Sequence, residues 1–253
     1  MVLTRQAIIR IAKDVKYIIN NPIQNIFYKH DQNNLTYGYA LIIGNKNTPY
    51  SYGNYLFQFT FPDNYPYEPP KLKFLTNDGS MRFHPNLYIN GKVCLSIINT
   101  WNGEGWTSSN NINSILLILS SILDNNSLTY EPGIDIQNIN VKKYNLLVSY
   151  KNIEYTIIKI IKFIYTLDEN YNYSNINDNT IILFKNEILQ NFFNNYKTIY
   201  NNLENLKNNS HYYLTNNNNN NHIYISTYSL NFLLEFDKIK KELDFFINKY
   251  NLL

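Results

Sequence analysis

A single cysteine, Cys94, is present among the 253 residues of the chain. No disulfide can therefore form within the chain, which is typical of proteins from a reducing compartment. Charged residues are also scarce, at 16%, and 22 basic against 19 acidic side chains leave a net charge of only +3. Because Lys and Arg are scattered rather than clustered, the composition argues against a nucleic-acid partner.

Long apolar runs are missing as well. The most apolar stretch, IIKIIKFIYTL at 157–167, is interrupted by Lys159 and Lys162 and is too short to cross a bilayer. The N-terminal stretch MVLTRQAIIRIAKDVKYIINNP is amphipathic with interspersed Arg, Lys and Asp, unlike a signal peptide or a membrane anchor. We therefore expect a soluble protein of the cytoplasm or nucleus, with no membrane partner.

Metal-binding patterns are absent too. The four histidines and the lone cysteine do not group with carboxylates at the spacing of metal ligands. We expect no metal and no cofactor.

The first half of the chain predicts an α+β fold. Apolar residues at helical spacing predict an amphipathic helix over 4–20, ended by Asn20-Asn21-Pro22. Four segments rich in aromatic and branched residues then follow, separated by turn-rich stretches, and they predict an antiparallel meander of four strands. These segments are 25–31, 35–43, 54–61 and 71–75.

Helical periodicity dominates the second half. It begins with a helix at 112–123, for which Ser108, Ser109 or Asn110 could serve as N-cap. Apolar spacing predicts further helices at about 141–165, 180–207 and 229–250. The polar Asn tract before the last of these has no means of burying surface, and predicts a disordered loop near 215–222.

Residues 76–107 show little regular pattern. A coil of this length inside a compact domain is either functional or disordered, and large apolar residues such as Trp101 and Trp106 argue against disorder because they need somewhere to pack. Cys94 lies in this segment, where reactive groups are commonly exposed. The segment is therefore the candidate functional region.

The surroundings of Cys94 indicate acyl transfer. Asn86 precedes it by eight positions across a predicted turn at Asn90-Gly91, which could place the Asn amide beside the sulfur as a donor to an oxyanion. Only His84 is near enough to act as a base, and the following Pro85 favours a structural role for it. Thioester exchange needs no strong base, because a thiolate attacks one thioester to form another.

The sequence here resembles the ubiquitin-conjugating (E2) enzymes. The residues that carry the resemblance occur in the family's order and cover about 4–165: FPDNYPYEPPKLKF, the triplet HPN at 84–86, NGKVCLSI around Cys94, and Trp106 before a helix. A more specific resemblance is to the large E2 class, through NLY, CLS, NTW and the EPG turn at 131–133. It implies the α+β E2 (UBC) fold, with an N-terminal helix, a four-stranded antiparallel meander, an irregular active-site segment, flanking helices and a C-terminal helical extension. The implied domains are a catalytic core at 1–165 and a helical extension at 166–253.

The resemblance implies a catalytic role for two residues. Cys94 would carry ubiquitin, or a ubiquitin-like modifier, as a thioester received from an activating enzyme (E1) and passed to a lysine of a protein substrate. Asn86 would stabilise the oxyanion formed as lysine attacks, or hold the loop over the active site. His84 and Pro85 would shape that loop.

It also implies partner contacts. The N-terminal helix contacts E1 in this family, which would place Arg5 and Arg10 at that surface. Tyr67 and Ser108 would lie near the contact for a RING or HECT ligase (E3).

Two departures from the family pattern concern the active site. Ser96 stands where many E2 enzymes have Asp after the Cys-Leu pair, and Ile97–Gly105 is longer than in small E2 enzymes, so we expect this insertion to border the catalytic cleft. Many members also carry an acidic residue that orients the lysine, for which Asp124 and Glu131 are the local candidates.

Simpler roles stay open for several of these residues. Asn86 could merely satisfy turn backbone, Asp124 could merely close the end of a helix, and Arg5 and Arg10 could present a solvated face. For the whole chain, the alternative is a noncatalytic E2-like module that binds ubiquitin or serves as a scaffold.

Overall fold

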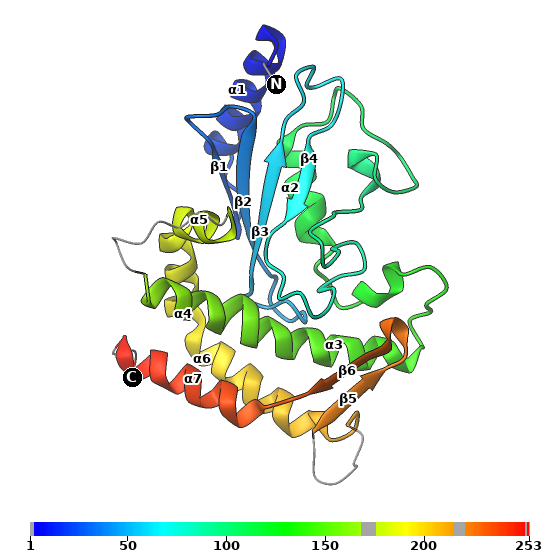
Figure 1. Cartoon of the computed structure of the whole chain (residues 1–253), viewed down its shortest axis with the longest axis vertical. Helices are drawn as coiled ribbons and strands as arrows, with labels where there is room; N and C mark the ends of the chain where they lie inside the picture. Colours follow the sequence, from blue (N-terminus) through cyan, green and yellow to red (C-terminus); the bar gives the residue numbers. More distant parts are fainter. Residues whose placement is uncertain (1–2, 168–175, 215–220, 251, 253) are drawn as a thin grey trace. The chain divides into compact units, whose positions relative to one another are not determined.

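The computed structural model describes residues 3–167, 176–214, 221–250 and 252. The chain folds into two compact units (Figure 1). The first comprises Met1–Gly44 and Tyr55–Leu123, and the second comprises Asn45–Asn54 and Asp124–Leu253. The candidate loop around Cys94 belongs to the first unit.

The N-terminal helix α1 spans Arg5–Asn20, as its amphipathic pattern predicts. Thr4 caps it, because its side chain accepts a hydrogen bond from the Ala7 N–H at 3.1 Å. Ala7, Ile11 and Asp14 are its buried residues, and the helix packs against α2.

Four antiparallel strands form the sheet of the first unit, in the order β1-β2-β3-β4 (Figure 1). Their bounds are Ile26–His30 (β1), Tyr37–Ile43 (β2), Asn54–Thr60 (β3) and Lys71–Phe74 (β4). Phe27 pairs with Leu41, and Phe57 with Phe74. Buried Phe57, Phe59 and Phe74 contribute to the core. The predicted α+β class and meander are confirmed.

Helix α2 spans Ile112–Ser121 and packs against β2. Its N-cap is Asn111, one residue beyond the three candidates that the sequence offered. The Asn111 side chain accepts from the Ser114 N–H at 2.9 Å, and the Ser114 hydroxyl accepts from the Asn111 N–H. This reciprocal capping box provides hydrogen-bond acceptors for two backbone N–H groups, those of Asn111 and Ser114. An N-cap at Ser108, Ser109 or Asn110 would not pair these two groups.

The second unit is mainly helical. Its helices are η2 (Ser127–Tyr130, 3₁₀), α3 (Ile139–Lys151), η3 (Asn152–Lys159, π), α4 (Ile160–Tyr165), α5 (Ile176–Leu183), α6 (Lys185–Ser210), η4 (Thr227–Ser229, 3₁₀) and α7 (Phe236–Lys249). The helix predicted at 141–165 is thus α3, η3 and α4 in succession. The helix predicted at 180–207 is two helices, which meet at the buried Phe184.

A two-stranded hairpin replaces the start of the last predicted helix. Strands β5 (His222–Ile225) and β6 (Leu230–Leu233) pair antiparallel, with Ile223 opposite Phe232. Helix at 229–235 was therefore a wrong prediction, and α7 begins only at Phe236. The loop predicted near 215–222 lies mostly outside the described residues, and His222 already belongs to β5.

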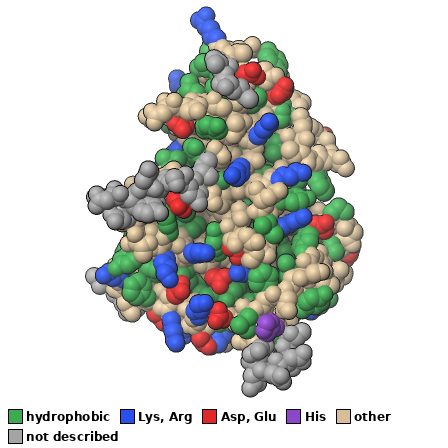
Figure 2. Space-filling view, in the orientation of Figure 1, with side chains coloured by type: hydrophobic (Ala, Val, Ile, Leu, Met, Phe, Trp, Pro, Cys, Tyr) green, Lys and Arg blue, Asp and Glu red, His purple; other side chains and the backbone are tan. Residues whose placement is uncertain are grey.

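Charges of both signs are interspersed on the face of the molecule shown in Figure 2. Among the residues that the structure describes, no helix has the length and apolar character that a membrane crossing requires.

Candidate functional site

The segment that follows β4 returns to pair with it. Lys92 forms an isolated antiparallel bridge with Lys73, and the Phe74 N–H donates to the Gly91 carbonyl at 2.8 Å. Gly91 has a φ of 87° and closes a turn by donating to the Tyr88 carbonyl at 2.9 Å. A side chain here would place its Cβ 2.9 Å from the Phe74 oxygen, so only glycine fits. The turn predicted at Asn90-Gly91 is confirmed.

This turn brings Asn86 and Cys94 together. The Cys94 N–H donates to the Asn86 carbonyl at 2.9 Å, and the Asn86 side-chain amide donates to the Cys94 carbonyl at 2.6 Å. The neighbouring pair Leu87 and Val93 forms an antiparallel bridge. The amide therefore reaches the cysteine as expected, but the acceptor in this structure is the main-chain oxygen.

Cys94 is a free thiol with only 2% of its surface exposed. The expectation that irregular backbone would expose it is wrong. Loop residues are usually accessible, but here the loop is paired with β4 on one side and tied to the segment after Cys94 on the other, so the cysteine packs inside.

His84 shapes this loop. It is fully buried, and its Nδ1 accepts the Asn86 N–H at 3.0 Å, so its proton lies on Nε2. Burial lowers its pKa to about 3. A ring that resists protonation this strongly is a poor general base, which agrees with the structural role that Pro85 suggested. Pro85 is itself buried, and its carbonyl accepts from Arg82.

Thr100 was not singled out from the sequence, yet it holds both neighbours of Cys94. Its hydroxyl accepts from the Leu95 N–H at 2.9 Å and donates to the Val93 carbonyl at 2.9 Å. The insertion at Ile97–Gly105 therefore lies directly against the cysteine segment. The only sequence signal was its position in that insertion.

Ser96 is half-buried and begins the 3₁₀ turn η1 (Ser96–Ile98). The insertion folds back on it, because a Cβ on Gly103, whose φ is 130°, would lie 3.1 Å from the Ser96 Cβ. Asn99 closes the insertion by accepting the Trp106 N–H at 2.8 Å. Trp101 is 45% exposed, so the expectation that it packs inside is wrong.

The two tyrosines of the proline-rich loop have different surroundings. Tyr67 is 63% exposed, and its hydroxyl accepts a hydrogen bond from Gln6 at 2.7 Å. Tyr65 is fully buried beside Trp106, whose indole N–H donates to the Pro66 carbonyl at 2.7 Å. Burial, and then the Asp14 carboxylate to which its hydroxyl donates, raise the pKa of Tyr65.

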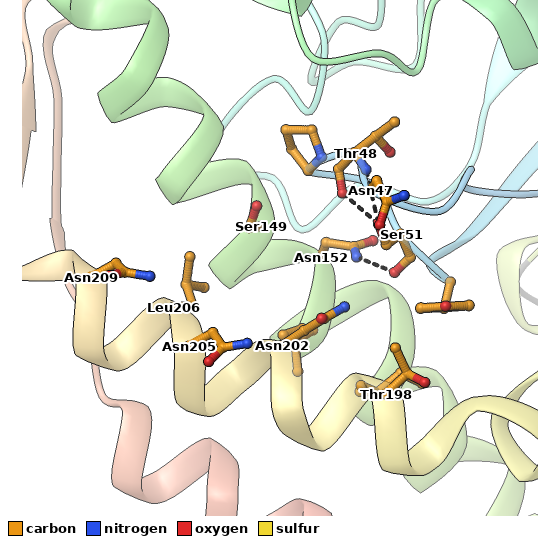
Figure 3. Close-up of a pocket in the computed structure, with 14 residues that line it drawn as sticks. Asn47, Thr48, Ser51, Ser149, Asn152, Thr198, Asn202, Asn205, Leu206 and Asn209 are labelled. Atoms are coloured by element: carbon orange, nitrogen blue, oxygen red, sulfur yellow. Dashed lines mark hydrogen bonds between the residues drawn. The ribbon is translucent and has the colours of Figure 1, made fainter.

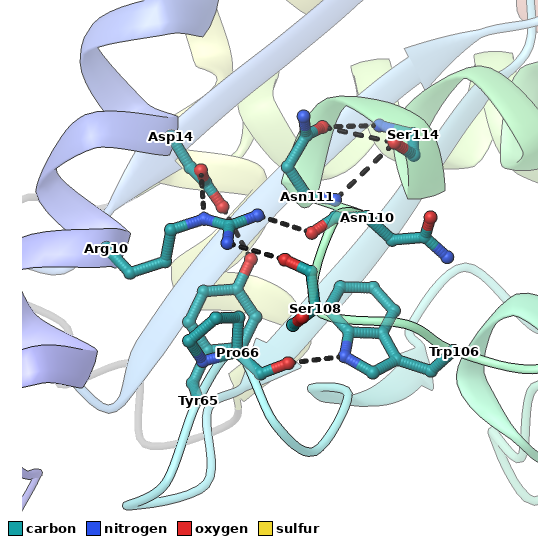
Figure 4. Close-up of polar contacts among 9 residues, drawn as sticks. All are labelled: Arg10, Asp14, Tyr65, Pro66, Trp106, Ser108, Asn110, Asn111 and Ser114. Atoms are coloured by element: carbon teal, nitrogen blue, oxygen red, sulfur yellow. Dashed lines mark hydrogen bonds and ion pairs between the residues drawn. The ribbon is translucent and has the colours of Figure 1, made fainter.

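Arg10 ties α1 to the segment before α2 (Figure 4). Its guanidinium donates to the Ser108 and Asn110 carbonyls and to the buried Asp14 carboxylate, the last at 2.9 Å. Asp14 also accepts from the Tyr65 hydroxyl at 2.5 Å. Arg10 thus has a structural task, whereas Arg5 is exposed in the first turn of α1. Contact of either residue with a partner stays a prediction.

Asp124 lies in the other compact unit. Its carboxylate accepts from the Asn126 N–H at 2.7 Å and from the Tyr130 hydroxyl at 3.2 Å, so it closes the turn after α2. Glu131 accepts from the Tyr228 hydroxyl. Within the described ranges, no group of three or more His, Cys, Asp or Glu could hold a metal ion.

Comparisons with known proteins assign the chain to a family. Residues 10–152 match the family described as "Ubiquitin-conjugating enzyme". The ubiquitin-conjugating enzyme E2 Z of Xenopus tropicalis is 34% identical over 162 residues, which are 63% of this chain and 52% of that protein. The protein of the same name from Homo sapiens is 35% identical over 160 residues, 62% of this chain and 45% of its own.

The chain spans about half the length of these curated relatives. A solved structure, human ubiquitin-conjugating enzyme E2 G1, is 30% identical and aligns with a TM-score of 0.43 over 49% of this chain and 98% of its own. The family match runs from within α1 to the end of α3, and so includes the sheet and the whole loop around Cys94.

Proposed function

Since the chain belongs to the ubiquitin-conjugating enzyme family and has the UBC fold, we propose that it accepts ubiquitin or a ubiquitin-like modifier from E1 as a thioester on Cys94. It then transfers the modifier to a lysine of a protein substrate. The observation that carries the proposal is the reciprocal pair of hydrogen bonds between Asn86 and the sole cysteine.

The chemistry proceeds in two exchanges. The Cys94 thiolate attacks the carbonyl of the E1 thioester, and the tetrahedral oxyanion collapses to expel the E1 thiolate, so one thioester replaces another. A neutral lysine amine then attacks the new thioester, the Cys94 thiolate leaves, and an isopeptide bond forms. The surplus proton of the amine passes to water or to a nearby base.

Asn86 is the proposed oxyanion donor. An Asn side-chain amide carries two N–H donors, and the bond to the Cys94 carbonyl accounts for one of them. That bond fixes the amide plane next to the reacting residue, so little reorganisation is needed to direct a donor at the developing charge. His84 and Pro85 serve by holding the Asn86 backbone in place.

Charging requires a local opening around Cys94, because a thiol that is 2% exposed cannot receive a polypeptide terminus unchanged. Thr100 holds the flanks of the cysteine from the insertion, so the insertion is the part proposed to move. Iodoacetamide applied to the native protein should label Cys94 slowly but completely. A thiol that stays inert until the protein is denatured would contradict the proposal.

The remaining site residues are proposed contacts and shaping groups. Arg5 and Arg10 would face E1, and Tyr67 and Ser108 would face a RING or HECT ligase, since Tyr67 offers an exposed ring and Ser108 is exposed. Ser96 would border the path of the incoming lysine. Asp124 is proposed to orient that lysine, although its carboxylate already holds the turn after α2.

The test is charging with a panel of E1 enzymes and modifiers in the presence of ATP. The wild-type chain should form an adduct that a reducing agent removes, Cys94→Ser a more persistent oxyester, and Cys94→Ala none. An adduct on the Cys94→Ala variant would show that another residue is the acceptor.

A noncatalytic ubiquitin-binding or scaffold module is the second candidate, and the burial of Cys94 favours it. The retained cysteine within an intact HPN loop favours catalysis. Failure to charge with every E1, together with measurable ubiquitin binding, would establish the noncatalytic function.

A further inference from the structure

The backbone around Cys94 is held on two sides. Leu95 is extended, with φ and ψ of −140° and 142°, and in an extended chain the main-chain groups of successive residues point in opposite directions. The N–H and the carbonyl of Cys94 are both bound to Asn86, at 2.9 and 2.6 Å. The Val93 carbonyl and the Leu95 N–H, on the other side, are both bound to the Thr100 hydroxyl.

This hydroxyl takes the place of a neighbouring strand. In a sheet, such a carbonyl and such an N–H pair with a donor and an acceptor of the adjacent strand. The Thr100 Oγ1 supplies both, because it donates to the Val93 carbonyl and accepts the Leu95 N–H, each at 2.9 Å. A side chain that neither donates nor accepts, such as valine, would leave both groups unbound.

Access to the thiol requires one of these two sides to open. Cys94 is 2% exposed, so a path to its sulfur needs movement of the backbone next to it. The lining of the cavity in Figure 3 comes from the loop 45–54, α3, η3 and α6 of the second unit, and does not include Cys94. The opening is therefore sought in the segment itself.

The two sides differ in how readily they open. Asn86 is 9% exposed and its N–H is bound to the fully buried His84, so its bonds lie within the core of the loop. Thr100 is exposed, in a stretch, 99–105, in which every residue is exposed. Water replaces the hydrogen bonds of an exposed group at little cost, and such bonds open first in native proteins. The Thr100 side is therefore the weaker of the two.

We propose that Thr100 is a positioning residue that controls access to Cys94. Release of its two bonds frees the Val93 carbonyl and the Leu95 N–H, so that this side of the segment moves away. The Asn86 side stays closed meanwhile, which keeps the amide beside the reacting residue. The inference rests on the proposed function and deepens it, because this opening admits the thioester donor to the sulfur.

The first test uses the wild-type full chain and needs no E1. One opening exposes both the Leu95 N–H and the Cys94 thiol, so hydrogen exchange at Leu95 and alkylation of Cys94 by iodoacetamide should be slowed by the same factor relative to an unfolded peptide. The Cys94 N–H, which Asn86 holds, should exchange more slowly than the Leu95 N–H by roughly 10-fold or more, since its side stays closed. Equal exchange at the two amides would show that the whole segment opens together, and would overturn the proposal.

Substitution at Thr100 tests the hydroxyl itself. Thr100→Val keeps the size of the side chain but removes its bonds, and should speed alkylation of Cys94 roughly 5–100-fold, the combined effect of two hydrogen bonds. Thr100→Ser retains the hydroxyl and should be labelled near the wild-type rate. Thr107→Val is the matched control, because Thr107 is also exposed but its hydroxyl is bonded to that of Ser109.

Labelling at increasing urea concentrations separates local opening from a loss of global stability. The faster labelling of Thr100→Val should depend little on urea below the unfolding transition, as for a local opening. Three outcomes contradict the proposal: labelling of Thr100→Val at the wild-type rate, labelling of Thr100→Ser as fast as Thr100→Val, or a gain that follows the loss of global stability.

E1 charging is measured separately on the same variants. A Thr100→Val chain that is labelled fast and is charged by no E1 would disprove the proposed function, while it would confirm that Thr100 controls access to Cys94. A chain that charges with E1 but shows no effect of Thr100→Val on labelling would have the opposite meaning.

Discussion

The Asn86 side-chain amide donates a hydrogen bond to the Cys94 carbonyl. The same amide is the proposed donor to the oxyanion. We expect Asn86→Ala to slow lysine attack by about 10²-fold if it supplies one oxyanion donor. Charging by E1 should slow much less. The measurement is single-turnover discharge of the preformed thioester to free lysine, compared with the rate of charging.

Asn90→Ala is the control, because Asn90 lies in the same loop but is exposed, and its side chain only accepts the Lys92 N–H at 3.0 Å. Its discharge rate should stay near that of the wild type. If Asn86→Ala slows both steps equally, the amide serves only to hold the loop.

His84 should make the stability of the protein depend on pH. Its pKa is lowered in the folded state from 6.5 to about 3, so the unfolded chain binds a proton that the folded chain refuses. Its contribution is fully present above pH 6.5 and is lost as pH falls toward 3. Within that window we expect the free energy of unfolding to fall by about 1.4 kcal/mol per pH unit from this residue.

Urea unfolding between pH 7 and pH 4 measures this effect. The free energy of unfolding of His84→Gln should depend less steeply on pH, because one proton fewer is taken up on unfolding. This holds even if the variant is less stable at pH 7. His211→Gln, at an exposed position, should retain the wild-type slope. Equal slopes for His84→Gln and the wild type would contradict the burial of a neutral ring.

The pairing of Asn86 with Cys94 could be predicted from the sequence because a turn at Asn90-Gly91 is a local signal. The burial of the thiol could not, since it depends on residues that come later in the chain. Thr100 illustrates this: a threonine in an irregular insertion gives no sign that its hydroxyl will bridge Val93 and Leu95.

At the scale of elements, Arg10 connects α1 to the segment that leads into α2. Arg10→Met would remove bonds to the Ser108 and Asn110 carbonyls and leave Asp14, which is 6% exposed, without its cation. We expect a loss of no more than about 3–5 kcal/mol in the free energy of unfolding, the cost of leaving one charge of a buried pair uncompensated, because Arg10 itself is 20% exposed.

Arg5→Met is the matched control on the same helix and should change stability by no more than about 0.5 kcal/mol, since Arg5 is exposed. Both variants are measured by urea unfolding and by E1 charging. If Arg10→Met charges poorly at wild-type stability, Arg10 is a partner contact and not a structural tie.

Elements with a clear period were the predictable ones. Alternation and turn residues defined β1 to β4, and helical spacing defined α1 and α2. The hairpin of β5 and β6 was missed because its runs, HIYI and LNFL, are four residues long and their apolar residues also suit a helix. The two runs form strands because they pair with each other, and this pairing cannot be seen in the sequence.

At the scale of the molecule, the C-terminal extension is part of the second unit. Asn191 of α6 donates to the Tyr52 carbonyl at 2.8 Å, and Asn54 donates to the Thr156 carbonyl at 2.9 Å. The loop 45–54 is thereby bound to helices from beyond residue 150. The sequence predicted a helical extension but showed no sign of this docking, which depends on hydrogen bonds between residues 139 and 102 positions apart. The catalytic boundary at residue 165 stays a prediction.

Truncation after residue 165 tests that boundary. The cut removes α5, α6 and α7, and with them the buried Phe192, Ile199 and Leu203. Loss of each such side chain costs about 2–5 kcal/mol, and a whole domain is stable by only about 5–15 kcal/mol. We therefore expect the second unit of the 1–165 fragment to unfold, with increased binding of a hydrophobic dye and a non-cooperative urea transition compared with the full chain. A soluble fragment that unfolds cooperatively and charges with E1 would instead show that residues 1–165 fold as an independent core. In that case the remaining helices of the second unit would bury their apolar faces without α6.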